Sequence, residues 1–308
     1  MPVREPHVVT LSATDGVPLA ADLHLPADGV VTHAVVIAPA MAVKRRYYSA
    51  FSAWLAEGGA AVIVPDYRGI GGSGHARTEA SMVVWGERDL PAAAAALRAR
   101  YPDVPLLYVG HSAGGQLFGL LGGLQQVEAF AGVMLVASGS GYWRHYAGWA
   151  RAGMWAIWHV GLPVLTRLFG YLPMRRLGQG EDVPKGVAHE WARWGRHPRY
   201  VGSHADAHGG LGYTRWSGPL RAYAVTDDSY APPPAVAALV ALYPNADAET
   251  ITVTPASLGV TQVGHFGFFR PAFRDTLWVE ARAWLHARAG LGERAGLGER
   301  APLREAAE

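Results

Sequence analysis

Three residues that are far apart in the chain have the types and the order needed for nucleophilic chemistry. Ser112 lies in VGHSAGGQ, residues 109–116, and matches the pattern Gly-x-Ser-x-Gly. A pair of aspartates follows at 227–228, and a histidine follows at 265. A serine hydroxyl attacks a carbonyl group only when a histidine removes its proton, and that histidine needs a carboxylate to orient it. The order serine, acid, histidine therefore predicts a catalytic triad.

The surroundings of Ser112 distinguish a nucleophile from a serine in an ordinary glycine-rich turn. A predicted buried strand, VPLLYVG (104–110), precedes it, and a helix is predicted from residue 114 to about 125. A nucleophile on such a strand-to-helix turn has strained backbone angles, and small neighbours relieve the crowding. Gly110 and Gly114 meet this requirement. A turn chosen only for packing a helix on a sheet is the alternative, and the flanking elements favour the nucleophile.

Position along the chain selects the acid and the base. The two aspartates end a predicted strand, and adjacent side chains there point in opposite directions, so only one can face the histidine. We favour Asp228, because a proline follows it by four residues and leads into a helix, and we interpret Asp227 as a turn or capping residue. His265 lies in VTQVGHFGFFRP (260–271), after the last predicted strand. Of the thirteen histidines, it is the one between this strand and the predicted final helix.

The elements that would position these residues alternate along the chain. Residues 7–26 predict a hairpin, and apolar runs that follow it predict strands buried on both faces. These runs occupy 33–40, 60–69, 104–110, 129–138, 220–228 and 249–255. Helical patterns separate the runs, so the sequence predicts an α/β fold with a mostly parallel sheet.

One long segment interrupts this alternation. We expect 1–138 and 216–288 to form the sheet core and 139–215, which shows no strand pattern, to be an inserted helical cap. Residues 289–308 contain the hexapeptide AGLGER twice in tandem, and we expect a flexible tail there.

Four motifs together give the chain a family resemblance. PDYRGIGGSG (65–74), VGHSAGGQ, the TDD…AP stretch and GHFGFFR (264–270) resemble the α/β-hydrolase superfamily, and more closely a bacterial branch of its serine hydrolases. The resemblance covers about 8–288 and implies an α/β-hydrolase fold with a helical cap. It also implies that the backbone N–H groups of Ala113 and Met41 form an oxyanion hole. Many relatives have His-Gly at the second position where this chain has Pro39-Ala40, so Ala40 remains an alternative to Met41. Asp66 and Arg68 match a motif that is mostly structural in the superfamily.

Aromatic residues are concentrated in the predicted cap. Six of the eleven tryptophans lie within 139–215. They anchor a helical lid on the core, or they line an apolar binding pocket. The second interpretation predicts an ester with an apolar acyl or aryl group as substrate. The candidate pocket residues are Tyr142, Trp143, Trp155, Trp158 and Phe266.

Composition limits other functions. The formal net charge is +2 without a long Lys/Arg run, which argues against nucleic acid as a partner. The chain has no cysteine, and HADAH (204–208) is interpreted as a solvated loop rather than a metal site, so we expect neither metal nor cofactor. The first residues lack a basic segment followed by an apolar one, and we expect a cytoplasmic protein. Assembly into a homo-oligomer stays open.

The most apolar stretch, 154–172, is interrupted by His159, Pro163 and Arg167. It is too short to span a bilayer, and a buried or interfacial helix pair is the better interpretation. Peripheral membrane association through this stretch is a weaker hypothesis.

Several functions are compatible with these residues. The leading hypothesis is a serine hydrolase that forms an acyl-enzyme on a carboxylic ester or thioester, in the manner of carboxylesterases and lipases. An acyltransferase, cyclase or thioesterase with the same triad is the alternative, and a non-catalytic ligand-binding protein of the same fold is the weakest.

Overall fold

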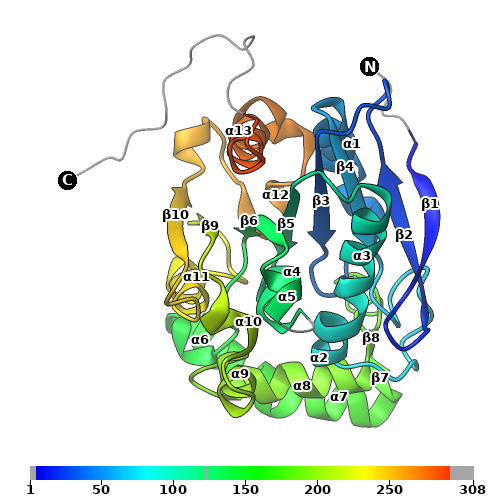
Figure 1. Cartoon of the computed structure of the whole chain (residues 1–308). Coiled ribbons are helices and arrows are strands. Elements are labelled where there is room, and N and C mark those ends of the chain that lie inside the picture. The colour runs from blue at the N-terminus through cyan, green and yellow to red at the C-terminus, as the bar shows by residue number, and fades with distance from the viewer. Residues whose placement is uncertain (1–4, 122–123, 292–308) are drawn as a thin grey trace.

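The computed structural model describes residues 5–121 and 124–291, and an eight-stranded sheet forms its centre (Figure 1). The strand order is β1-β2-β4-β3-β5-β6-β9-β10. Strands β1 and β2 form the predicted hairpin, β2 pairs antiparallel with β4, and the remaining neighbours pair in parallel. The bounds are β1 (His7–Ser12), β2 (Pro18–His24), β3 (His33–Ala38), β4 (Ala60–Pro65), β5 (Leu106–His111), β6 (Phe130–Val136), β9 (Pro219–Val225) and β10 (Asp247–Val253). The predicted α/β class is thereby confirmed.

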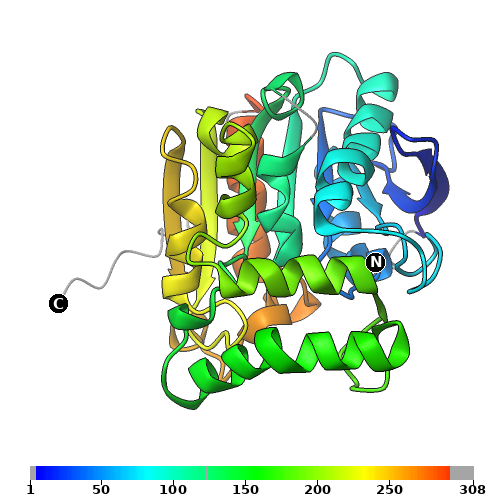
Figure 2. The same ribbon diagram turned by 90° about the horizontal axis from the view of Figure 1, so that it is seen from below.

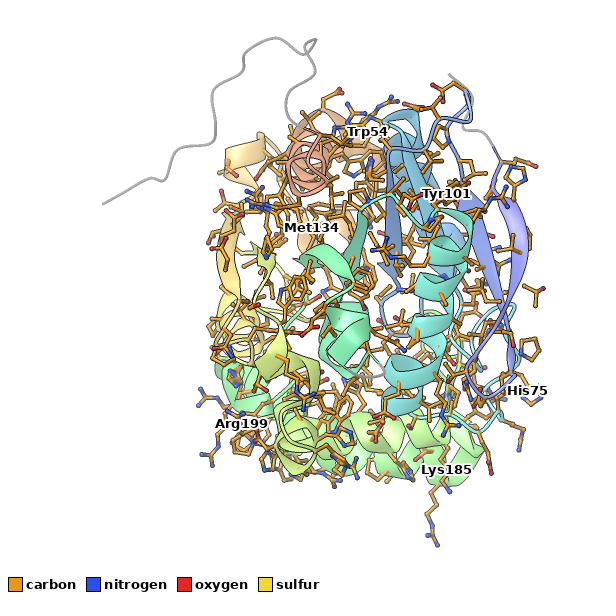
Figure 3. The ribbon with its side chains drawn as sticks, in the orientation of Figure 1. Trp54, His75, Tyr101, Met134, Lys185 and Arg199 are labelled. Carbon is orange, nitrogen blue, oxygen red and sulfur yellow. The ribbon has the colours of Figure 1, made fainter. Side chains whose placement is uncertain are left out.

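The central strands are apolar throughout because helices cover both faces of the sheet. Alternate residues of one strand contribute to two separate cores, since successive side chains point to opposite faces. In β3, Val35 and Ile37 belong to one core, while Ala34 and Val36 belong to the other. The first core includes α1 (Ser49–Glu57) and α13 (Val279–Arg288), and it contains both Trp54 and Met134, which Figure 3 labels.

The second core packs against the opposite face of the sheet. The helices there are α2 (Met82–Val84), α3 (Leu90–Arg100), α4 (Ala113–Gln116), α5 (Leu124–Val127) and α11 (Pro233–Val240). The single helix that we predicted over 114–125 is instead divided into α4, a 3₁₀ turn at Phe118–Leu120, and α5. Glycine weakens a helix, and Gly119 lies against the ring of Tyr213, which leaves no room for a side chain.

The segment between β6 and β9 is mainly helical and lies together at one end of the molecule, below the sheet in Figure 1. It contains α6 (Gly148–Ala156), α7 (Leu162–Phe169), α8 (Lys185–Arg196), α9 (Gly202–Ala207) and α10 (Leu211–Arg215). A π-helical turn, Ile157–Gly161, joins α6 and α7. Figure 2 shows the continuous helix made of α6, this turn and α7 (green) beside α8 (yellow-green).

Two details of this segment concern earlier expectations. We predicted no strand in 139–215, but β7 (Tyr171–Leu172) and β8 (Val183–Pro184) form a short antiparallel pair. Two residues per strand are too few to leave a periodic pattern in the sequence. The tandem repeat, apart from its first residues, lies outside the described part of the chain. No helix within 5–121 and 124–291 is both long and apolar enough to span a membrane.

Candidate active site

Ser112 occupies a sharp turn between β5 and α4. Its backbone has φ 50° and ψ −115°, a conformation that costs free energy for any residue other than glycine. The turn is possible because the residues two positions before and after Ser112, Gly110 and Gly114, lack side chains. A Cβ atom on Gly110 would overlap the backbone of Gly115, and one on Gly114 would overlap the carbonyl group of Ala38. The glycines of the motif are therefore required by close backbone approach.

The structure brings Asp228 and His265 into direct contact. Asp228 Oδ2 accepts a hydrogen bond from His265 Nδ1 at 2.7 Å, and both side chains are buried. The other carboxylate oxygen, Oδ1, accepts from the backbone N–H groups of Tyr230 (2.7 Å) and Ala231 (2.9 Å). These bonds hold the carboxylate in one orientation. Because Nδ1 of the imidazole is engaged, Nε2 is the nitrogen available to take a proton.

Asp227 has a different set of contacts. Its two carboxylate oxygens accept hydrogen bonds from the backbone N–H groups of Val263 and Gly264, each at 3.0 Å. These residues immediately precede His265 in the chain. Asp228 thus contacts the imidazole, whereas Asp227 fastens the loop that carries it. This arrangement agrees with the interpretation of Asp227 as a capping residue.

The candidate oxyanion donors lie where α4 meets the end of β3. Ala113 is the first residue of α4, and the first N–H groups of a helix have no partner within it. The close approach of Gly114 to Ala38 brings this helix end against the loop that contains Met41. The backbone N–H of Ala40 donates to Tyr48 Oη at 2.8 Å. Since Ala40 is engaged, Met41 is the better of the two candidates.

A buried chain of hydrogen bonds connects three parts of the site, and sequence reasoning missed it. Tyr48 Oη accepts from the N–H of Ala40 and lies 2.8 Å from His111 Nδ1, so the hydroxyl donates to that nitrogen. His111 Nε2 then donates to the backbone carbonyl of His265 at 3.0 Å. Burial, and next the charge of His265, hold the pKa of His111 well below its usual range, so the ring is neutral. His111 stands inside the serine motif, but nothing in the sequence links Tyr48 to it.

Aromatic side chains surround His265. Phe266 packs edge-on against its ring, with 5.0 Å between centroids, and Tyr230 lies 5.1 Å away on another side. Tyr146, from the helical segment, donates its hydroxyl to the carbonyl of Tyr230 at 2.7 Å. Burial, and then the charge of Asp228, raise the pKa of Tyr146 above its usual value. The helical segment therefore reaches the site through Tyr146 and Tyr230, neither of which we selected from the sequence.

The remaining candidate pocket residues lie in different surroundings. Tyr142 and Trp143 are half-buried, with ring centroids 5.9 Å apart. Trp158 is buried within the helical segment, where its indole N–H donates to Gly141 O at 2.8 Å. Trp155 is 44% exposed and stacks on His159. Phe266 is thus the candidate that contacts the imidazole.

Other charged side chains form ion pairs within the fold. Arg68 pairs with Asp15 and Asp89, and Asp66 bonds to Arg45. A cavity of about 330 Å³ is lined mostly by charged residues: Lys44, Arg45, Arg46, Gly71, Gly72, Arg175 and Glu181. No group of three or more histidine, cysteine or acidic residues that could hold a metal occurs within the described ranges.

Comparison with known proteins gives one family and several similar structures. A family model described as serine aminopeptidase, S33, matches residues 29–187, which is more than half of the chain. No curated protein matches. A soluble variant of the monoglyceride lipase of Saccharomyces cerevisiae is 13% identical, with a TM-score of 0.66 over 94% of this chain and 96% of that one.

Two further structures have the same fold at low identity. Est1E from Butyrivibrio proteoclasticus, with bound ferulic acid, is 15% identical (TM-score 0.59; 92% and 100% of the two chains). A thermophilic esterase from Thermogutta terrifontis is 16% identical (TM-score 0.56; 92% and 99%).

Proposed function

Because the chain belongs to the serine aminopeptidase S33 family of α/β-hydrolases, we propose that it is a serine hydrolase that cleaves carboxylic esters through an acyl-enzyme. The observation that supports this best is the bond between Asp228 and His265, which lies beside the strained turn of Ser112. His111 directly precedes Ser112 and bonds to the backbone of His265, so the turn and the imidazole loop are neighbours.

The proposed reaction has two stages. Ser112 Oγ attacks the ester carbonyl carbon while its proton passes to His265 Nε2, and Asp228 stabilises the imidazolium that forms. The N–H groups of Ala113 and Met41 bind the oxyanion. The tetrahedral species then collapses, the C–O bond to the alcohol breaks, and the imidazolium protonates the departing oxygen. Water attacks the acyl-enzyme in the same way and releases the carboxylic acid and free Ser112.

We further propose that 139–215 acts as a cap and that its aromatic residues favour an apolar acyl or aryl group. Phe266 forms one wall, because it packs against His265, and Tyr142 and Trp143 enter from the cap side. Trp158 is buried in the cap and fastens the residue before Tyr142, because its indole N–H donates to Gly141 O. Trp155 is left out of the pocket because it faces solvent.

A p-nitrophenyl ester series tests the function and the pocket together. We expect medium and longer acyl chains to be hydrolysed with a higher kcat/KM than acetate, and we expect a fluorophosphonate probe to label Ser112. Ser112→Ala should lower turnover by about three orders of magnitude or more. Ser257→Ala, a change of an exposed serine in the 3₁₀ turn Ala256–Leu258, is the matched control. A folded protein that acquires no label would refute the proposal, and a strong preference for acetate would refute the apolar pocket alone.

The name of the family supports a second substrate class, so aminoacyl p-nitroanilides belong in the same panel. Acyl transfer uses the same acyl-enzyme with another acceptor. Added alcohols or amines that divert the acyl group to a new ester or amide would identify it.

A further inference from the structure

The continuous helix formed by α6, the π turn and α7 presents large apolar side chains to solvent. Trp149 is 92% exposed and Leu168 is 71% exposed, although such residues are usually buried. Contiguous exposed apolar surface on a soluble protein commonly marks an interaction site. We call these side chains the outer face: Trp149, Ile157, Val160, Val164 and Leu168.

The spacing of these residues shows that they form a true face. Val160, Val164 and Leu168 recur every four residues and therefore line one side of α7 and the turn before it. Each follows a buried residue by two positions, which corresponds to about 200° around a helix. The buried residues are Trp158, Leu162 and Thr166. One side of the helix is thus packed on α8, and the opposite side is apolar without being packed.

The stretch of chain that carries the outer face has charges of a single sign. Between Glu128 and Glu181 the chain has no aspartate or glutamate, but it has arginines at 144, 151, 167, 175 and 176. Only Arg175 among them has a carboxylate partner within 5–121 and 124–291. Arg144 and Arg176 instead lie over the rings of Trp143 and Phe169. In the part of the chain that the structure describes, the helix of the outer face therefore has four arginines on or near it that form no ion pair: 144, 151, 167 and 176.

We propose that the outer face docks on an anionic lipid surface, with the helix lying flat in the interface. A helix with exposed tryptophan and aliphatic residues on one side, and arginines beside them, is suited to the boundary between headgroups and acyl chains. Anionic headgroups complement the arginines. A second copy of this chain is a poorer partner, because two such faces would bring arginines of like charge together.

The docking surface is connected to the candidate site. Tyr146, two residues before α6, bonds to the carbonyl of Tyr230, and the Tyr230 ring lies beside His265. Docking would therefore hold the site next to the lipid surface. The inference does not rest on the proposed function, because binding to lipid requires no nucleophile.

Co-sedimentation of the full chain with vesicles tests this proposal. We expect binding to vesicles of phosphatidylcholine with phosphatidylserine, and much weaker binding to phosphatidylcholine alone. The double variant Trp149→Ser/Leu168→Ser should lose most of the bound fraction, and Arg167→Gln should weaken binding about fivefold. Val8→Ser, at an exposed apolar position on β1, is the matched control and should bind like the wild type.

Three results would overturn the proposal: no binding to the anionic vesicles, wild-type binding by the folded double variant, or a stable dimer that this variant dissociates. The last result would identify a second copy as the occupant. Ser112→Ala should bind vesicles like the wild type, so failure of the catalytic proposal and failure of lipid docking are distinguishable.

Discussion

The turn at Ser112 and the helix that spans α6 and α7 differ in how tightly the surrounding atoms pack against them. At the turn, Gly114 touches the carbonyl of Ala38, and the backbone leaves no space for another atom. On the helix, Gly153 has nothing within 4 Å of where a Cβ would stand, and Trp149 is open to solvent. A region that holds a reacting group in place needs such constraint, whereas a surface that meets a partner needs accessible area. The following variants test this contrast, beginning with the largest expected effect.

Adjacent aspartates should differ strongly in their effect on activity. Asp228→Asn removes the charge that holds His265, and we expect kcat to fall by about 10³ to 10⁴. Asp227→Asn retains an oxygen that can accept from Val263 or Gly264, so the loss should be tenfold or less. Steady-state kinetics on one ester, with circular dichroism to verify folding, measures both. Equal losses would show that the assignment of the acid is wrong.

Two glycine substitutions should change stability in opposite directions. Gly114→Ala places a methyl group against the backbone of Ala38, and we expect about 3 kcal/mol of lost stability or failure to fold. Gly153→Ala lies within α6 in open space and should raise the free energy of unfolding by about 0.5–1 kcal/mol. Urea denaturation measures both. A stable Gly114→Ala protein would contradict the close approach at the turn.

Removing the buried hydroxyl of Tyr48 should lower activity by shifting the loops that position the catalytic residues. Tyr48→Phe leaves the N–H of Ala40 and His111 Nδ1 without their partner, at a cost of about 1–3 kcal/mol in stability. We expect kcat to fall about tenfold with KM little changed, because the loops of the site shift while the pocket remains. The partly exposed Tyr101→Phe is the control. A rise in KM with unchanged kcat would argue that Tyr48 serves substrate binding instead.

Stability should fall in mild acid because of histidines buried in the sheet. Burial lowers the pKa of His24 and of His33 to about 4. The unfolded chain, with histidine pKa values near 6.5, binds more protons between these limits, so stability is full above pH 6.5 and falls as pH decreases toward 4. Each residue should contribute a slope of up to about 1.4 kcal/mol per pH unit. His33→Gln should reduce the slope measured by urea unfolding, whereas a change at the exposed His75 should leave it unaltered.

The sheet and the order of the candidate residues could be predicted from the sequence because each has a local signature. Buried strands are continuous apolar runs, and Ser112 and His265 stand directly after or between such elements. The division of α4 from α5 was missed, because the 3₁₀ turn between them packs Gly119 against Tyr213, which is distant in the chain and leaves no local pattern. The link from Tyr48 to His111 was missed for the same reason.

The tryptophans of the helical segment show another limit. Composition indicates that large apolar residues gather there, but it does not say which side of a helix is covered. Trp158 and Trp194 are buried, whereas Trp149 is open to solvent, and all three look alike in the sequence. Only the packing of the Ile157–Gly161 turn and of α7 on α8 separates anchors from exposed residues.

The chain of bonds from Ala40 through Tyr48 and His111 to His265 also has a consequence for dynamics. The amide proton of Ala40 is held by a hydroxyl that a second ring holds in turn, and that ring is tied to the loop of the imidazole. Solvent reaches this proton only when the whole arrangement opens. Its hydrogen-exchange rate is therefore a direct measure of how often the site comes apart, obtained without any substrate.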